Sequence, residues 1–537
     1  MKFFGIEKRN VSTRKPLQAV SVVFFILLAA AFSLILFYHK ISLFLFEKDK
    51  IDVFKEDLQQ IAIYFLPIDK QVAHFLVTLD HIIQGYLAGE NILITQEKEI
   101  EETREYMQKN KSYLKKMGFA GYEKIIDFVA DLRKYKSEFF DLMGKNKPYN
   151  YLVILQNTNE KRPNGGFFGS FAFITMDKGH IKNLEIVDSY YPDFIAYRTR
   201  IMAPEWTSAF LPDRKIGFIA GNKFGFTDID GKNLKDLYEK MFNETYEMRK
   251  VKQTMAPDLY EKLLNKYIKG VIFIRSDTIE EIIPGFREKI WEWQFLNASV
   301  DLLRGEIRGN KKEMYIQEVK SFFAKHRTDI IKNVVNNFEE LTKKQAINIW
   351  LSNVSTGMQE TIQKNNLINT FKTGFMYAWD TNTSFDKVDG FVTKYIQIKD
   401  ANNDTVKEMR GDIIDINDLS KGKYTMGISY ELKVPDQYIA FIKGLEKKYD
   451  IEITDREKGI LAIQSSVFDD PKRGKVTKWR ETKSTLYVPK NIVITDVEGE
   501  TLYDEKFTTP FANGLFYQIL INTNNTKKSV KINFEMK

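Results

Sequence analysis

The chain is organised around the sequence YLVILQNTNEKRPNGGFFGSFAFIT, Tyr151–Thr175, in which one apolar run enters a dense polar turn and a second leaves it. The first run, Tyr151–Leu155, is β-branched and aliphatic, and the second is Phe167–Met176. Asp177–Gly179 has the residues of a tight turn, and Ile181–Val187 has the length and composition of a third strand. Because short apolar runs bounded by turn residues are typical of strands, the sequence predicts a β-meander with one polar corner.

The polar corner could bind a ligand. A guanidinium at Arg162 can hold a phosphate or a carboxylate with two parallel hydrogen bonds, and backbone amides around Gly165 and Gly166 can support it. The loop after the third strand adds Asp188 and Asp193, either of which could hold a divalent cation.

The same corner also has a structural interpretation. Arg162 and Glu160 would form a local ion pair, Asn157 would cap the turn, and Gly165 and Gly166 would permit positive φ. The residues alone favour this structural interpretation, because the cluster is too short to specify a reaction.

Beyond the meander the pattern changes to helix and then back to strand. A helix is expected from about Gly231 to Tyr246, and Gly270–Ile274 (GVIFI) is a continuous apolar run suited to a buried strand. Strand, helix and strand in this order predict an α/β sheet built on the meander.

Asp228, just before that helix, has two possible roles. Asp228–Gly231 resembles part of a calcium loop, with Glu239 at the closing position. However, Gly231 comes too early for such a loop, and Lys232 occupies a ligand position. A helix N-cap is the preferred role, because an aspartate there satisfies free backbone amides.

Composition excludes several classes of protein. The chain has 537 residues, 43% of them hydrophobic, so it can bury large cores and should hold more than one domain. Its net charge of +8 is a small excess over a long surface, and no basic face with interleaved aromatic residues indicates nucleic-acid binding. The absence of cysteine excludes disulfides, cysteine-based metal sites and thiol nucleophiles. No G-x-S-x-G elbow, Walker loop or H-E-x-x-H motif is present.

The N-terminus predicts a membrane anchor. A basic tail, residues 1–16, precedes the uncharged apolar run Leu17–Tyr38, which as a helix spans roughly 30 Å, the thickness of a hydrocarbon core. The positive charge favours a cytoplasmic N-terminus and an extracytoplasmic remainder. A cleaved signal peptide with Ala29–Ala31 as its small-residue site is the alternative, but the apolar run continues through Phe32–Phe37. We expect a single-pass protein of the cell membrane.

The remaining chain divides by pattern into four further regions. Helical spacing is expected over 39–147, an α/β domain over 148–300, helical spacing again over 301–378, and short alternating runs over 379–537. The alternating runs predict an antiparallel sandwich or barrel. The expected fold class is therefore a multidomain α+β or α/β protein with a transmembrane helix, a helical stalk, a mixed domain, a helical segment and a C-terminal β domain.

The corner carries a family resemblance. The pattern Asn157-x-x-Glu160-x-Arg162-Pro163-x-Gly165-Gly166-Phe167-x-Gly169-Ser170, after an apolar strand, resembles the signature of a bacterial family of unknown function, the domain-of-unknown-function family four-thousand-twelve. Members resemble this chain in layout, with a basic N-terminus, one membrane span and a helical stretch before the signature. This sequence departs from the family near its buried strand, where Lys269 and Arg275 stand in place of acidic residues.

A fainter likeness is to the LytR–CpsA–Psr envelope proteins. The resemblance implies transfer of lipid-pyrophosphate-linked glycopolymers to the cell wall, by arginines and aspartates with a divalent metal such as Mg²⁺. The positions to test would be Arg162, Asp188 and Asp228, with Arg198, Arg214 and Arg275 as further arginines.

Two hypotheses follow. The favoured one is a non-catalytic, membrane-anchored envelope protein without a cofactor, which binds a surface polymer or another protein. The alternative is the metal-assisted phosphotransferase. The candidate ligand-binding residues for either are Asn157, Glu160, Arg162, Gly165, Gly166, Asp188, Asp193 and Asp228.

Overall fold

The computed structural model describes most of the chain from residue 133 onward. The described residues are 133–189, 217–242, 263–292 with short gaps, 337–382, 391–449 and 466–537 with short gaps, together with a few single residues between 98 and 112 and residue 192. The expected tail (1–16), the expected membrane span (17–38) and most of the expected stalk lie outside them. Among the described helices, none has the length and apolar character needed to cross a membrane.

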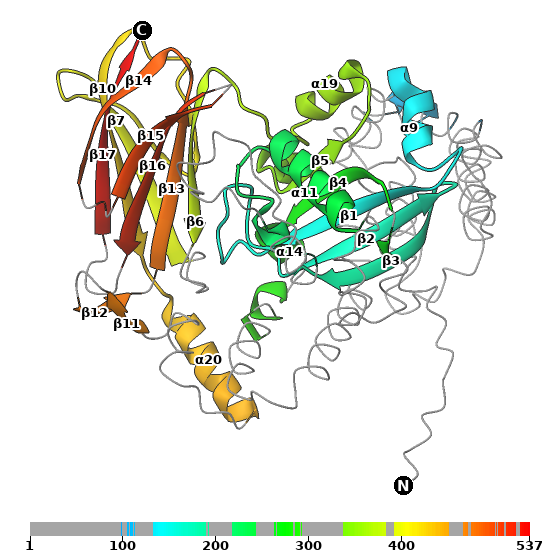
Figure 1. Cartoon of the computed structure of the whole chain (residues 1–537), viewed down its shortest axis with the longest axis horizontal. Helices are drawn as coiled ribbons and strands as arrows, with labels where there is room; N and C mark the ends of the chain where they lie inside the picture. The colour runs from blue at the N-terminus through cyan, green and yellow to red at the C-terminus, as the bar shows by residue number, and fades with distance from the viewer. Residues whose placement is uncertain are drawn as a thin grey trace.

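The predicted meander is confirmed as part of a five-stranded mixed sheet. Its spatial order is β3-β2-β1-β4-β5, and β1 pairs antiparallel with β2 but parallel with β4 (Figure 1). The strands are β1 (Tyr149–Gln156), β2 (Ser170–Asp177), β3 (His180–Asp188), β4 (Ile268–Arg275) and β5 (Ile347–Leu351). The parallel pairing of β1 with β4 confirms the strand–helix–strand prediction, because a parallel neighbour requires a long crossover connection.

The helix α11 (Thr227–Phe242) covers one face of this sheet (Figure 1). Its buried residues Leu234, Leu237, Tyr238 and Met241 follow helical spacing and pack on apolar side chains of β1, β2 and β4. Tyr238 stacks on Phe173 of β2, with the ring centroids 5.9 Å apart. The mixed sheet and α11 thus share one core.

The C-terminal part is an antiparallel β-sandwich, as predicted. The inner sheet, which faces the mixed domain, has the order β15-β16-β13-β6-β9, and the outer sheet has the order β14-β17-β10-β7-β8. The inner strands are β15 (Tyr503–Thr508), β16 (Asn513–Ile521), β13 (Arg480–Val488), β6 (Phe375–Asn382) and β9 (Ile413–Asp415). The outer strands are β14 (Ile492–Gly499), β17 (Lys527–Met536), β10 (Gly422–Leu432), β7 (Val392–Lys399) and β8 (Thr405–Arg410).

Smaller elements complete the described structure. The hairpin β11 (Ser466–Asp470) and β12 (Gly474–Lys478) forms a separate two-stranded sheet. The helix α20 (Asp436–Tyr449) packs Tyr438, Ile442 and Leu445 into the sandwich core. Figure 1 shows α20 at the end of the sandwich near the hairpin.

The helical expectation for 301–378 is wrong in two places. Two helices are present in its described part, α18 (Phe338–Lys343) and α19 (Thr356–Lys364), but β5 lies between them and β6 begins at Phe375. β5 is an edge strand that pairs antiparallel with β4, so its conformation is set by a partner more than 70 residues earlier in the chain. Such pairing overrides a local helical pattern, because the edge of a buried sheet offers hydrogen bonds that a short helix cannot replace.

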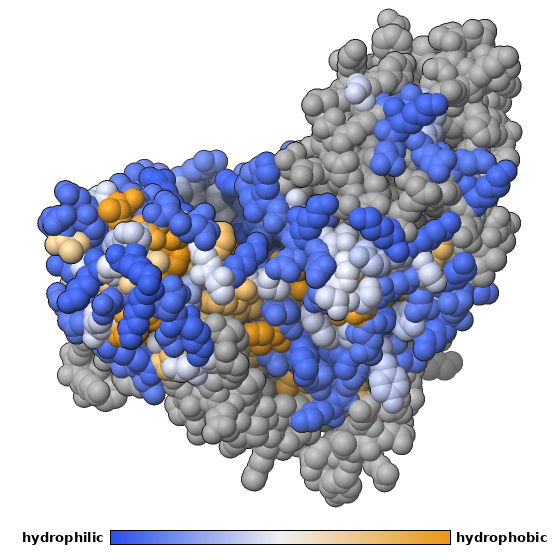
Figure 2. Space-filling view, turned by 90° about the horizontal axis from the view of Figure 1, so that it is seen from above, coloured by the Kyte–Doolittle hydropathy of each residue, from blue (hydrophilic) through white to orange (hydrophobic). Residues whose placement is uncertain are grey.

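An aromatic cluster joins the mixed domain to the inner sheet. Phe226, just before α11, makes edge contacts with Tyr377 of β6 and Tyr487 of β13, at centroid distances of 5.1 and 5.2 Å. Asn369 bonds to the same turn, because its side-chain amide donates to the carbonyl of Gly225 and its backbone exchanges hydrogen bonds with Thr227. Seen from above, the described surface is mostly hydrophilic, and hydrophobic residues show on the sandwich and along its boundary with the mixed domain (Figure 2).

Candidate functional site

The polar corner between β1 and β2 closes on itself through backbone hydrogen bonds. The amide of Asn157 donates to the carbonyl of Phe167 at 2.7 Å, and the amide of Phe167 donates to the carbonyl of Glu160 at 2.8 Å. The side-chain oxygen of Asn157 accepts from the amide of Asn159 at 3.1 Å. Asn157 therefore caps the turn, as the structural interpretation predicts.

Arg162 lies inside this corner. Only 7% of the residue is exposed, its Nη2 lies 3.7 Å from Oε1 of Glu160, and its guanidinium lies 5.4 Å from the ring centroid of Phe167. Glu160 is 2% exposed. The side chain of Arg162 is therefore buried, because the loop folds it back against a carboxylate and an aromatic ring.

The two glycines are required by the shape of the loop. Gly165 has a φ of +104°, and its amide donates to the carbonyl of Arg162 at 3.0 Å. A Cβ on Gly166 would overlap the backbone carbonyl of Asn157, so only glycine fits there. The amide of Gly165 is therefore used within the loop rather than presented to a ligand.

Asn222 bonds the turn before α11 to the corner, Asp230 fixes the backbone of that turn, and neither is among the candidate residues from the sequence. The side-chain amide of Asn222 donates to the carbonyl of Gly166 at 2.7 Å. The carboxylate of Asp230, which is fully buried, accepts from the amides of Phe224 and Gly225, both at 3.0 Å. Burial raises the pKa of Asp230 well above its ordinary value, and the two amide donors oppose that rise.

Asp228 lies in the first turn of α11 rather than at its N-cap, because the helix begins four residues earlier than expected. Burial raises the pKa of its carboxyl group. Residues 228–239 are helical throughout, and Oε1 of Glu239 accepts from the amide of Ile268 at 2.8 Å. The segment therefore does not form the loop that the calcium alternative requires.

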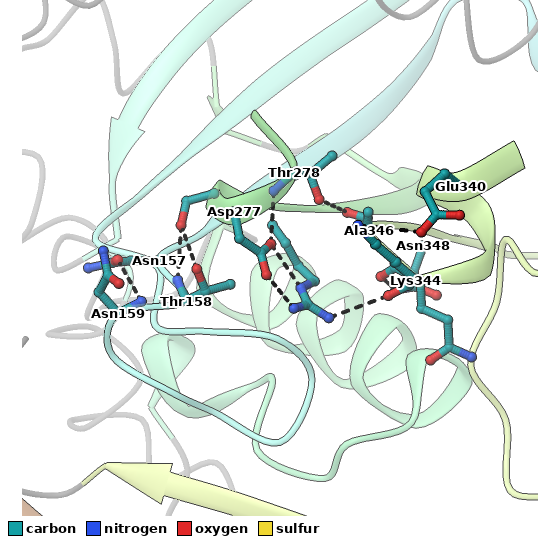
Figure 3. Close-up of polar contacts among 12 residues, drawn as sticks. Asn157, Thr158, Asn159, Asp277, Thr278, Glu340, Lys344, Ala346 and Asn348 are labelled. Atoms are coloured by element: carbon teal, nitrogen blue, oxygen red, sulfur yellow. Dashed lines mark hydrogen bonds and ion pairs between the residues drawn. The ribbon is translucent and has the colours of Figure 1, made fainter. Parts of the chain in front are cut away.

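Arg275, the last residue of β4, lies beside the corner, but its guanidinium bonds to residues outside the corner. Its Nε donates to Oδ1 of Asp277 at 3.1 Å, and its Nη1 donates to the carbonyl of Lys344 at 3.4 Å (Figure 3). The neighbouring Ser276, at the start of α14 (Ser276–Ile282), accepts from the amide of Thr158 at 3.1 Å. These contacts tie β4 to the corner.

The structure thus brings together five of the eight candidate residues, namely Asn157, Glu160, Arg162, Gly165 and Gly166. Asp188 is the last residue of β3, where it pairs with Ser170. Asp193, Arg198 and Arg214 lie outside the described residues. Within the described part of the chain, no three or more histidine, aspartate or glutamate side chains are grouped to hold a metal ion.

The fold and the polar corner define a class of two-domain protein, in which a mixed sheet with a buried polar corner packs against a β-sandwich. Residues 146–285 match the model of the family described as "Protein of unknown function (DUF4012)", so the chain carries a domain of that family. This confirms the family resemblance, whereas the likeness to LytR–CpsA–Psr proteins stays a prediction. The chain matches neither a curated protein nor a solved structure.

Proposed function

We propose that the protein is a single-pass, membrane-anchored cell-envelope protein that binds a surface polymer or a partner protein and does not itself catalyse a reaction. The observation that carries the non-catalytic part is the position of Arg162. A phosphate-binding arginine must reach its ligand, but this one is buried against Glu160 and Phe167. The anchor is supported by the apolar run Leu17–Tyr38.

The phosphotransferase alternative gains no support from the described arginines. It needs Arg162 and further arginines around one phosphate, together with aspartates and Mg²⁺. Arg162 contacts Glu160, and Arg275 bonds to Asp277 and to a backbone carbonyl. The binding hypothesis is therefore the better supported of the two.

The test compares Arg162→Ala with the wild type in stability and in binding. Removal of one partner from a buried ion pair should lower the free energy of unfolding by about 3 kcal/mol. The full-length protein in detergent should sediment with purified cell-wall sacculi, and the variant should sediment equally well at a temperature where both proteins are folded.

A matched control is Arg287→Ala. Arg287 also pairs with a glutamate, Glu280, but its side chain is 60% exposed, so the expected loss is below about 1 kcal/mol. The proposal would be overturned if Arg162→Ala kept full stability and lost Mg²⁺-dependent binding of a polyprenyl-pyrophosphate analogue.

A further inference from the structure

One core position of the β-sandwich is occupied by a lysine. β7 alternates between buried and half-buried residues, and Lys394 falls in phase with Val392, Ile396 and Ile398, which line the sandwich core. Only 2% of the Lys394 side chain is exposed. An ammonium group so placed carries a large desolvation cost, and its partners must offset that cost.

Two carboxylates contact this amine, one from the inner sheet and one from a turn between the two sheets. Oδ2 of Asp380 on β6, whose side chain is 1% exposed, lies 3.0 Å from Nζ of Lys394. Asp412, in the turn between β8 and β9, contacts Nζ directly through Oδ1, and Nζ also donates to the carbonyl of Ala378. Because Lys394 belongs to the outer sheet and Asp380 to the inner sheet, the cluster bridges the sandwich.

The two carboxylates differ in how firmly they are held. Oδ1 of Asp380 accepts from the hydroxyls of Ser484 at 2.8 Å and Tyr430 at 3.0 Å, and the latter hydroxyl lies 3.0 Å from that of Tyr517. Asp412 lies at the edge of the cluster, with 29% of its side chain exposed. Asp380 is thus fixed in a dry environment, whereas Asp412 has a path to solvent.

Charge sets the resting state of the cluster. Burial alone would lower the pKa of Lys394, but the charges of Asp380 and Asp412 outweigh burial and hold it above its ordinary value. Burial would raise the pKa of Asp412, but Lys394 and the nearby Lys161 hold it below its ordinary value. The resting state is an ammonium between two carboxylates.

A simple ion pair needs only one carboxylate. In this cluster the amine of Lys394 contacts a carboxylate oxygen of Asp412, and the carboxylate of Asp380 lies within reach of the same amine. The partly exposed position of Asp412 also gives a small product a path to solvent. We propose that Nζ of Lys394 and Cγ of Asp412 become joined in an intramolecular isopeptide bond, with Asp380 as the proton carrier. The bond would tie β7 covalently to the turn that connects the outer sheet with the inner sheet, in a chain that has no cysteine for a disulfide.

The chemistry balances with no added reactant. The ammonium of Lys394 gives one proton to Asp380, and the freed amine attacks Cγ of Asp412 while Asp380 passes that proton to an Asp412 oxygen. Asp380 then takes a second proton from the new nitrogen and gives it to the same oxygen. The carbon–oxygen bond breaks, one water leaves, the carbonyl reforms, and Asp380 ends as the carboxylate with which it began.

The folded core makes this reaction favourable in two ways. It holds the amine against the carboxyl group, which replaces an encounter in solution by contact at an effective concentration on the order of 10⁵ M or more. It also excludes water, so that the reaction replaces a buried ion pair by a neutral amide in a medium that disfavours charge.

The test is a peptide map of the denatured full-length protein after trypsin digestion. We expect residues 411–421, which contain Asp412, joined to residues 388–399, with no cleavage after Lys394 and a mass lower than the two free peptides by one water. Complete recovery of linear peptides cleaved after Lys394 would overturn the proposal, and this measurement needs no variant.

Variants assign the roles. Asp412→Asn should give the same branched peptide, because the amide loses ammonia where the acid loses water. Asp380→Asn should give linear peptides, because it cannot carry the proton, and Lys394→Arg should do the same while it keeps the cation. Circular dichroism shows which variants fold. A branch at residue 380 instead of 412 would overturn the assignment of Asp412.

Discussion

At the scale of single residues, the junction between the two domains depends on a glycine. Gly225 has a φ of +84°, and its carbonyl accepts from the side chain of Asn369 at 2.9 Å. A Cβ at this position would lie 2.5 Å from Nε1 of Trp379 on the inner sheet. The turn that carries Phe226 into the aromatic cluster can therefore be made only by a residue without a side chain.

Gly225→Ala should lower the free energy of unfolding by about 3 kcal/mol, since it adds a left-handed backbone penalty to a clash with Trp379. Urea unfolding measures the loss. Gly285→Ala is the matched control, because Gly285 has a similar φ of +76° but open space where a Cβ would stand, so only the backbone penalty of about 1 kcal/mol is expected. Equal losses in the two variants would contradict the close contact.

At the scale of elements, the two faces of β6 pack into two different hydrophobic cores. Met376, Ala378 and Asp380 point into the sandwich, while Tyr377 and Trp379 point to the mixed domain. The Tyr377 hydroxyl donates to the carbonyl of Thr370 at 3.2 Å and accepts from the amide of Lys372 at 3.1 Å. One strand thus serves two cores at once.

This burial predicts a pH dependence at the junction. Burial raises the pKa of Tyr377 from 10.0 to about 12, against the opposing effect of the amide of Lys372. The folded state holds the phenol proton more tightly, so the associated stability is complete below pH 10.0 and is lost as the pH rises toward about 12. Tyr377→Phe should flatten this decline by up to about 1.4 kcal/mol per pH unit.

Urea unfolding across that pH range measures the slope. Burial also raises the pKa of Tyr517 to about 12, so part of the decline in stability remains in the Tyr377→Phe variant. Tyr267→Phe, at a residue that is 75% exposed, is the control and should leave the slope as in the wild type. An unchanged slope in Tyr377→Phe would contradict the prediction.

Elements with local signals could be predicted from the sequence. The meander, β4 and most sandwich strands carry alternating or continuous apolar runs between turn residues. β5 and β6 could not be separated from helix, because their partners lie far away in the chain. In the corner, Asn157 and Glu160 follow from local turn chemistry, whereas the contacts of Asn222 and Asp230 depend on the fold. Lys394 did leave a signal, since in VTKYIQIK it stands in phase with the apolar residues.

At the scale of the whole molecule, the proposed anchor would determine on which side of the membrane the two domains lie. Leu17–Tyr38 should retain the full-length protein in the membrane pellet through an alkaline carbonate wash, because a spanning helix is held by the hydrophobic effect and not by charge. Immunoblotting of pellet and supernatant measures the partition. A shortened form that begins near Phe32 and appears in the supernatant would show the topology to be wrong.

The position of β17 in the outer sheet determines the order in which the two sheets can form. Among the described strands it comes latest in the chain, yet it pairs with both β10 and β14 in the interior of the outer sheet. During synthesis the outer sheet cannot be completed until β17 is available, whereas the mixed sheet can form once β5 is available. A chain cut before Lys527 would expose two unpaired strand edges, which invite aggregation and proteolysis. Truncated chains would therefore be removed by aggregation or proteolysis, and only intact chains would keep the surroundings of Lys394 dry.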